Sequence, residues 1–258
     1  MIKFSIVIPA YNNLELLKSA LESVFIQNYD NYEIIIVDDS QGNEIDNYIE
    51  QLGVARIRYY HNSPSKGAVL NWNYGLSLST GNAIIVLHHD EAFINNDYLK
   101  RISQLLNVYD AIVSNKKVLT PSGVKRDHVY TWYKRLAITF AYPIFSLNVI
   151  GPCACICCKK EICTTFDDRM HWLVDVDWYF RLLKKAKKTK YLKSLEILSH
   201  HGHQDQITKN INVSQMRSAD EDIVKEKYQN IIVNLMLKEA HVLRKLKTYF
   251  EQIKRETI

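Results

Sequence analysis

The sequence predicts an α/β fold organised around a mostly parallel sheet. In the first half of the chain, apolar runs rich in β-branched residues alternate with segments of helical periodicity. Strands that alternate with helices form parallel sheets with right-handed crossovers. Three of the apolar runs end in turn-forming or polar residues, at Pro9, Asp39 and His88. Because ligands bind at the carboxyl ends of strands in open α/β sheets, the same pattern predicts where the functional site lies.

The first half of the chain alternates regularly between strands and helices. Pro9 closes the first strand, since proline cannot donate a hydrogen bond to a sheet. Asn13 is a candidate N-cap, because its side chain can accept a hydrogen bond from the first turn of the following helix. We expect strands at residues 4–9, 33–37, 57–60 and 84–87, and helices at residues 14–25, 44–52 and 68–77.

The second half departs from this alternation. Residues 130–149 are apolar and aromatic around Pro143, which favours a broken helix or a lid, with a membrane-touching segment as the alternative. From residue 214 the chain is helical and charged, which fits packing on the domain, self-association or contact with a membrane surface. We also expect helices at residues 98–107 and 172–183, and strands at residues 111–114, 117–119, 153–157 and 191–198.

All five cysteines lie between Cys153 and Cys163. Residues 153–157 alternate as a strand does, and reduced cysteines pack well as small buried hydrophobes, so core packing is the favoured interpretation. A zinc site made by Cys155, Cys158 and Cys163 is the alternative, but no second cysteine pair completes the usual spacing.

The composition limits the classes of partner. Apolar residues make up 47% and charged residues 24% of the chain, which is ordinary for a globular protein. The net charge of +5 suits an anionic small ligand or an acidic membrane surface, and no nucleic-acid-binding motif occurs. The N-terminus leads directly into a strand pattern without a signal peptide, and no run is apolar enough to span a membrane. We therefore expect a cytoplasmic protein, with peripheral contact at the inner face of the cell membrane as a further option.

The strand at residues 84–87 ends in His88, His89, Asp90 and Glu91. Burying two unpaired carboxylates would be costly, so we expect them to face solvent, a cation or a ligand. Imidazole and carboxylate groups bind divalent metals. No G-x-G-x-x-G follows the first strand and no P-loop motif occurs, so dinucleotide-binding and P-loop sites are poorly supported. The polar cluster at this strand end predicts a divalent metal that carries a phosphorylated ligand.

Several motifs follow one another in a characteristic order. They are SIVIPAYN at 5–12, EIIIVDDS at 33–40, Gly67 with NYGL at 73–76 and Gly81, the strand ending at Asp90, and DVD at 175–177 with Arg181. Together they resemble the family 2 glycosyltransferases of the GT-A fold, over about residues 3–205. The resemblance implies a GT-A domain at residues 1–210, with a nucleotide-binding half at 1–97 and an acceptor half at 98–210, and a C-terminal helical extension at 211–258.

The resemblance implies transfer of a sugar from a nucleotide-sugar donor to a hydroxyl of a saccharide or lipid-linked acceptor. It further implies inversion at the sugar carbon, Mn²⁺ or Mg²⁺ as the cofactor, and a place in cell-surface polysaccharide or glycolipid synthesis. The positions that match donor-binding residues of the family are Pro9 and Tyr11 in the nucleoside pocket, Asp39 at the base, and Lys66, Asn73 and His89 toward the ribose and diphosphate.

The metal and the base follow from the same resemblance. Asp90 matches the metal-binding carboxylate of the family, and Asp175 matches its catalytic base. His201 or His203 falls where a late metal or phosphate ligand occurs. His88 replaces the first aspartate of the family's D-x-D motif, so we expect a metal site of His88, Asp90 and His203 that prefers Mn²⁺ to Mg²⁺. Val174 replaces an acidic residue before the base, which makes Asp177 a candidate substitute for Asp175.

The chemistry of sugar transfer needs two separate acidic sites. A cation near Asp90 neutralises the leaving diphosphate, and a carboxylate such as Asp175 removes the acceptor proton from the opposite side of the sugar. A non-catalytic nucleotide-sugar or partner-binding module remains an alternative, with His88 and Val174 as marks of lost activity. A sugar nucleotidyltransferase is a second alternative, although no basic glycine-rich loop follows the first strand.

Overall fold

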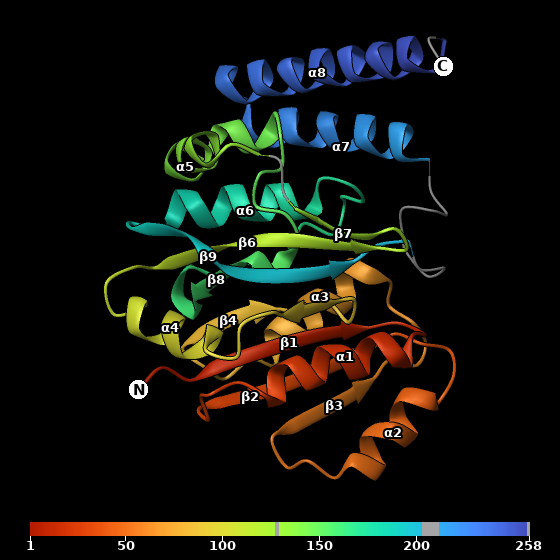
Figure 1. The fold of residues 1–258 in the computed structure, drawn as a ribbon, viewed down its shortest axis with the longest axis vertical. Helices are drawn as coiled ribbons and strands as arrows, with labels where there is room; N and C mark the ends of the chain where they lie inside the picture. Colours follow the sequence, from red (N-terminus) through yellow and green to blue (C-terminus); the bar gives the residue numbers. More distant parts are fainter. Residues whose placement is uncertain (127–128, 203–211, 257–258) are drawn as a thin grey trace.

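The computed structural model describes residues 1–126, 129–202 and 212–256, and it has the α/β fold that the sequence predicts. Figure 1 shows a twisted sheet flanked by helices, with α7 and α8 stacked as outer layers beyond α6. The strands are β1 Phe4–Ala10, β2 Tyr32–Asp38, β3 Ile57–His61, β4 Ala83–Val86, β5 Glu91–Phe93, β6 Ala111–Thr120, β7 Gly123–Arg126, β8 Ile156–Lys159 and β9 Thr189–His200. The helices are α1 Leu14–Phe25, α2 Glu44–Leu52, α3 Ala68–Ser77, α4 Tyr98–Leu105, α5 Thr131–Phe140, α6 Val174–Lys185, α7 Val213–Tyr228 and α8 Ile231–Glu256. Short 3₁₀ turns are η1 Tyr142–Phe145, η2 Cys153–Cys155 and η3 Lys160–Ile162.

The first half of the chain forms the parallel part of the sheet, in the order β3-β2-β1-β4. All residues of β1, β2 and β4 are buried, because helices cover both faces of these strands. The predicted N-cap is confirmed, since Asn13 Oδ1 accepts a hydrogen bond from Leu16 N at 3.1 Å. A Cβ at Gly81 would lie 2.5 Å from Lys3 O, so only glycine lets the turn before β4 approach β1 this closely. The parallel register places the ends of β1, β2 and β4 at one edge of the sheet.

The second half extends the sheet in the order β4-β8-β6-β9-β5, with β7 paired to β6. The two strands expected at 111–114 and 117–119 are one strand, β6, whose pairing with β9 shifts register between Ser114 and Asn115. β6 is fully buried as far as Ser114 and half-buried from Asn115 onward, and this change of environment at the bulge explains why the sequence suggested two strands. β5 and β7 were not expected, because three or four residues are too few for a periodic pattern.

The strand expected at residues 153–157 exists, but its predicted bounds are wrong, since it runs from Ile156 to Lys159. Cys153–Cys155 forms the 3₁₀ turn η2, in which Cys155 N donates to Pro152 O at 2.9 Å, and the strand begins only at Ile156. Residues 153–158 are all buried, so the apparent alternation did not reflect a strand with two different faces. The five cysteines are free thiols in or beside the core, which agrees with core packing. Among the described residues, Cys155, Cys158 and Cys163 do not form a three-ligand cluster.

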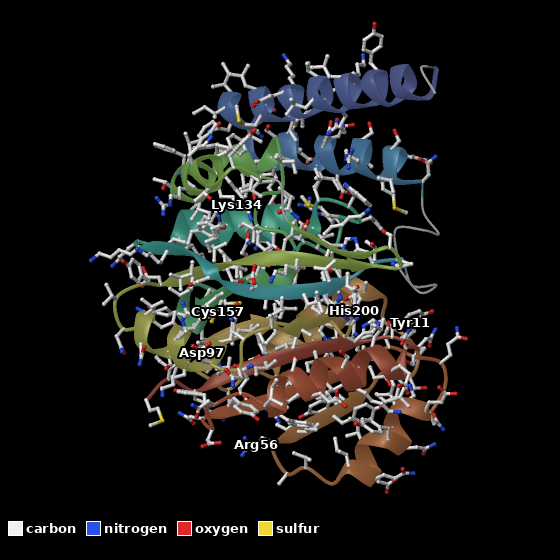
Figure 2. All side chains as sticks on the ribbon, in the orientation of Figure 1. Tyr11, Arg56, Asp97, Lys134, Cys157 and His200 are labelled. Carbon is white, nitrogen blue, oxygen red and sulfur yellow. The ribbon has the colours of Figure 1, made fainter. Side chains whose placement is uncertain are left out.

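The apolar segment at residues 130–149 is a broken helix, as expected. The helix α5 ends at Phe140, the φ of the following Ala141 is 66°, and η1 follows with Pro143 near its start. The tail is two helices, which separate after Tyr228 where Gln229 has a φ of 44°. Side chains fill the space between the layers (Figure 2). Within the described ranges, no helix is both long and apolar enough to cross a membrane.

Candidate active site

The end of β4 carries the histidines and carboxylates that the sequence singled out. Leu87 N donates to Val7 O at 2.8 Å, and the chain then turns so that His88 and Asp90 leave the sheet before β5 begins at Glu91. Glu91 is only 3% exposed, and its carboxylate accepts hydrogen bonds from His88 N and Ala154 N. Glu91 therefore does not face solvent, although one of its carboxylate oxygens lies close enough to His88 and Asp90 to belong to a metal-ligand set. The buried carboxylate instead contacts His88 Nδ1 through Oε1 at 3.1 Å.

His88 is held with one ring nitrogen directed away from Glu91. Its ring packs against Trp72, with the ring centroids 4.7 Å apart. Its Nε2 atom is buried and has no hydrogen-bond partner among the described residues. Burial lowers the pKa of His88, but the charge and hydrogen bond of Glu91, together with the charges of Asp90 and Asp175, outweigh burial and leave the pKa above its usual value. A carboxylate that orients one imidazole nitrogen while the other faces a site is the usual arrangement behind a metal-bound histidine.

The donor set at this strand end fits a divalent transition metal. One ligand atom from each of His88, Asp90 and Glu91 lies within 4.8 Å of the others. An imidazole beside carboxylates suits Mn²⁺ better than Mg²⁺, which prefers oxygen ligands. The end of β9 also meets this site, because His200 N donates to Asp90 O at 2.8 Å. His201 N donates to Leu119 O at 2.8 Å, and His203, which the sequence suggested as a third ligand, lies outside the described residues.

Asp175 lies in the first turn of α6, and its charge interacts with that of His88. Its Oδ2 atom accepts a hydrogen bond from Asn148 Nδ2 at 2.7 Å, and Oδ1 accepts one from Val176 N at 2.8 Å. Burial raises its pKa to about 6, while the two hydrogen bonds and His88 oppose that rise. A carboxylate with this pKa is ionised at neutral pH yet basic enough to accept a proton from a hydroxyl in a reaction.

The helix α7, which precedes the C-terminal helix α8, positions the start of α6. The Asp220 carboxylate is fully buried and accepts hydrogen bonds from the backbone N–H groups of His171, Trp172 and Leu173, at 2.6–3.1 Å. These residues form the turn that leads into α6, and a carboxylate at a helix N-terminus is favoured by the helix dipole. The site therefore depends on a residue about 45 positions beyond Asp175 in the sequence.

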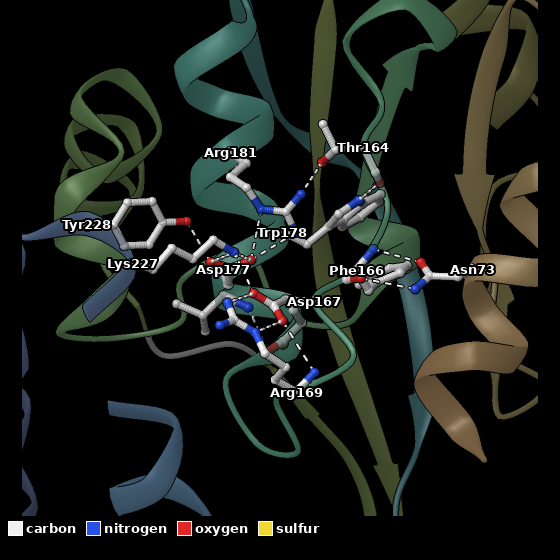
Figure 3. A network of polar contacts seen from close by, with 12 residues as sticks. Asn73, Thr164, Phe166, Asp167, Arg169, Asp177, Trp178, Arg181, Lys227 and Tyr228 are labelled. Atoms are coloured by element: carbon white, nitrogen blue, oxygen red, sulfur yellow. Dashed lines mark hydrogen bonds and ion pairs between the residues drawn. The ribbon is translucent and has the colours of Figure 1, made fainter. Parts of the chain in front are cut away.

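A polar network next to this turn holds Asp177, the alternative base (Figure 3). Asp177 is fully buried and binds Arg181 at 2.8 Å, Lys227 at 3.0 Å and the hydroxyl of Tyr228. Lys227 also binds Asp167 at 2.8 Å. Since both Asp177 oxygens are occupied by cationic or hydroxyl partners, the geometry favours Asp175 as the base.

On the donor side, Asp39 organises the loop between β3 and α3. Its carboxylate accepts hydrogen bonds from Asn62 Nδ2, Ser65 Oγ, Lys66 N and Gly67 N, at distances of 2.6–3.0 Å. Burial raises the pKa of Asp39, but these four hydrogen bonds outweigh burial and leave it below its usual value. The carboxylate is thus fully used within the protein, and it shapes the loop from which the exposed Lys66 side chain extends.

The other expected donor residues lie at the ends of β1 and β4 and on α3. Pro9 is buried at the end of β1, and His89 Nδ1 lies 3.2 Å from Pro9 O. Tyr11 is 42% exposed just beyond β1. Asn73 is engaged elsewhere, because its amide exchanges two hydrogen bonds with the main chain of Phe166, at 2.7 and 3.0 Å (Figure 3).

Sequence reasoning missed several residues of the site. Trp72, Asn148 and Asp220 carry no motif, and each reaches the site from an element far away in the sequence. The sequence singled out Glu91 as a carboxylate at this strand end, but it did not reveal that Glu91 is buried and contacts His88. Periodicity in the sequence cannot reveal such partners, because it reports only on which face of its own element a residue lies.

Comparison with known proteins agrees with the fold and indicates the family. Residues 5–163 match the family model Glycosyl transferase family 2. WcaA of Escherichia coli K12, described as a putative colanic acid biosynthesis glycosyl transferase, is 26% identical over 212 residues, which cover 79% of this chain and 75% of WcaA. Two further relatives, uncharacterized glycosyltransferases of Rickettsia typhi and Rickettsia bellii, are matched over 58% and 14% of their own lengths.

Two solved structures share the fold at low sequence identity. A crystal structure of S. aureus TarS with UDP-GlcNAc superposes with a TM-score of 0.70 at 14% identity, over 92% of this chain and 72% of that chain. The mannosyltransferase PcManGT from Pyrobaculum calidifontis, in complex with GDP-Man and Mn²⁺, gives a TM-score of 0.65 at 12% identity, over 93% of this chain and 73% of that chain. Because the family model covers more than half of the sequence and the fold is shared, this chain belongs to glycosyltransferase family 2 and is a glycosyltransferase of the GT-A fold.

Proposed function

We propose that this glycosyltransferase transfers a sugar with inversion from a nucleotide-sugar to an acceptor hydroxyl in polysaccharide assembly, with a divalent metal at the end of β4. The observation that carries the proposal is that Asp175, with a pKa of about 6, interacts with His88 beside Asp90. One carboxylate is thus poised as a base while another lies next to an imidazole that suits a cation. The polysaccharide context rests on the similarity to WcaA.

Each residue has a distinct part in the proposed reaction. His88 Nε2 and Asp90 would hold Mn²⁺, with Glu91 fixing the orientation of the imidazole. The metal, when bound, stabilises the negative charge of the leaving nucleoside diphosphate. Asp175 accepts the proton of the acceptor hydroxyl as that oxygen attacks the sugar carbon from the side opposite the diphosphate. Asn148 holds Asp175 in place through its 2.7 Å hydrogen bond.

The donor is bound, in this proposal, by the edge of the sheet where β1, β2 and β4 end. Pro9 and Tyr11 would line the nucleoside pocket, and Asp39 would act by holding the loop at residues 62–67 in shape. Lys66 is exposed on that loop, and its ammonium group would bind the negatively charged diphosphate. His89 lies against Pro9 and belongs to the same pocket, whereas Asn73 would contribute by anchoring Phe166.

The test is a turnover assay with UDP-, GDP- and dTDP-sugars in the presence of Mn²⁺, Mg²⁺ or EDTA. We expect one donor class to be hydrolysed or transferred, faster with Mn²⁺ than with Mg²⁺, and both D90N and D175N to lose at least about a hundredfold in turnover. D97N is the matched control, because Asp97 is a half-exposed carboxylate at the start of α4, away from the site. Full activity in D90N would contradict the metal assignment. Tight nucleotide binding without any turnover would instead support a non-catalytic binding module.

A further inference from the structure

The C-terminal helix α8 has apolar residues on two opposite faces. Val233, Leu237 and Ala240 are buried against the rest of the protein, at most 3% exposed. The other apolar set recurs on the outward side and is 48–76% exposed: Ile231, Leu235, Val242, Leu246 and Tyr249. At about 100° per residue, the outward set lies roughly opposite the buried set, so packing on the domain does not account for it.

The outward stripe runs along the outermost layer of the molecule. Figure 1 shows α8 at one end of the longest axis, with α7 between it and α6. Its 26 residues correspond to a helix of roughly 39 Å, long enough to present the stripe as an extended surface. Each of these side chains remains about half exposed or more, so much of the stripe is open to solvent. Apolar side chains that recur in this way along an exposed helix are typical of an interaction surface.

The charges beside the stripe are mainly positive. Lys238 and Lys245 are exposed and lie one heptad apart on the same flank of the stripe, and Glu239 is the acidic residue among the exposed positions described in α8. The sequence of residues 231–256 contains six lysines and arginines against three glutamates. A basic helix with an apolar stripe is complementary to an anionic, partly apolar partner.

The neighbouring helix α5 adds aromatic side chains. Both α5 and α8 pack against η1, so they belong to the same region of the fold. Trp132, Leu136 and Phe140 follow one another at intervals of four residues on α5 and are exposed by 65%, 39% and 60%. Arg135 is exposed beside them. Aromatic residues next to cationic ones are typical of the boundary between lipid headgroups and acyl chains.

Self-association through this face is disfavoured by the same charges. In an antiparallel pair of α8 helices, equivalent flanks face each other, so Lys238 and Lys245 would meet their own copies. In a parallel pair, these two lysines would face a flank with a single described acid, Glu239. An anionic lipid surface has no such conflict, because each lysine near it gains attraction.

We propose that the outward face of α8, together with the exposed aromatic face of α5, binds the surface of an anionic lipid bilayer. The helix would lie in the plane of the interface, with the stripe toward the acyl chains and Lys238 and Lys245 at the headgroups. This inference does not depend on the proposed metal or base, because it concerns a surface formed by other elements.

The test is sedimentation of the full chain with vesicles of phosphatidylcholine, with and without phosphatidylglycerol. We expect binding to the anionic vesicles that weakens as the salt concentration rises, and little binding to phosphatidylcholine alone. V242E should reduce binding roughly tenfold, and K238E/K245E should reduce it by at least as much. The matched control is V108E, because Val108 is 57% exposed, close to the 54% of Val242, and lies on the turn after α4.

Three outcomes would overturn the proposal. The first is that the wild-type protein stays in the supernatant with anionic vesicles at low salt. The second is that V108E and V242E reduce binding equally, which would mean that α8 is not the contact surface. The third is that light scattering shows a dimer that V242E converts to a monomer while vesicle binding is unchanged. Melting curves of the variants verify that each is folded before binding is compared.

Discussion

Replacing Asp175 by asparagine is expected to abolish turnover and yet to stabilise the protein at neutral pH. Asp175 has its pKa raised from 3.8 to about 6, chiefly because it is buried. Above about pH 6 the carboxylate is ionised in both the folded and the unfolded protein, and the folded protein bears the full cost of holding the charge. Below about pH 4 the group is protonated in both states, and that cost disappears.

The size of the stability change follows from the pKa shift of Asp175. A change of about 2 pKa units corresponds to about 3 kcal/mol of destabilisation by the ionised group at pH 8. Asparagine removes the charge, but it keeps only one acceptor oxygen for the hydrogen bonds from Val176 N and Asn148 Nδ2, a loss of about 1 kcal/mol. We therefore expect D175N to raise the free energy of unfolding by about 2 kcal/mol at pH 8, and to leave it nearly unchanged near pH 4.5.

Urea unfolding of wild type and D175N across this pH range measures the effect directly. The matched control is D168N, which replaces an exposed carboxylate on the loop before α6 and is expected to leave the free energy of unfolding unchanged. A stability difference between D175N and wild type that is the same at both pH values would refute the reasoning. A less stable D175N at pH 8 would do so as well, since it would mean that the ionised carboxylate stabilises the fold.

Three further predictions concern the carboxylates of Asp175, Glu33 and Asp220. In the wild type, kcat/KM should fall about tenfold for each pH unit below about 6, because Asp175 must be ionised to accept a proton; a profile that stays flat down to pH 5 would exclude it as the base. Burial raises the pKa of Glu33, but hydrogen bonds from Ser5 and Thr80 and the charge of Lys3 outweigh burial and lower the pKa to about 2. E33Q should therefore lose about 2–3 kcal/mol of stability at pH 7, and progressively less as the pH falls from about 5 to 2. An acid-denaturation curve measures this loss, and a loss that does not change with pH would contradict the prediction. D220A should reduce the free energy of unfolding by about 2–4 kcal/mol and lower kcat, because it leaves the backbone N–H groups of residues 171–173 without their acceptor. D222A, which changes an exposed position of the same helix, is the control and should change neither quantity when both variants are compared by urea unfolding and turnover.

Much of the fold could be predicted because its elements have strong local patterns. The apolar runs that became β1, β2 and β4 end where expected, within one or two residues, and Asn13 caps α1. The prediction was wrong where burial is not periodic. Every residue from Cys153 to Cys158 is buried, so the sequence could not distinguish a 3₁₀ turn from a strand at this position.

The residues of the candidate site could likewise be predicted from the sequence only in part. Motif order was sufficient to single out Asp39, Asp90 and Asp175 from the sequence, because strand ends and helix starts are local features. The partners that decide what these residues do come from other elements: Glu91 from β5 and Trp72 from α3 for His88, and Asn148 for Asp175. Whether a carboxylate is ionised, paired or buried depends on these partners, so no property of the local sequence reveals it.

By itself, the sequence determined the order of strands and helices, the edge of the sheet at which the polar residues gather and the family to which their motifs point. Only the tertiary structure decided that Glu91 is buried behind His88, that Asp220 of α7 holds the start of α6, and that α8 keeps an apolar stripe on its outer side. The physical reason is that periodicity records how each element divides its residues between two faces. What each face meets is set by packing between segments that are distant in the chain.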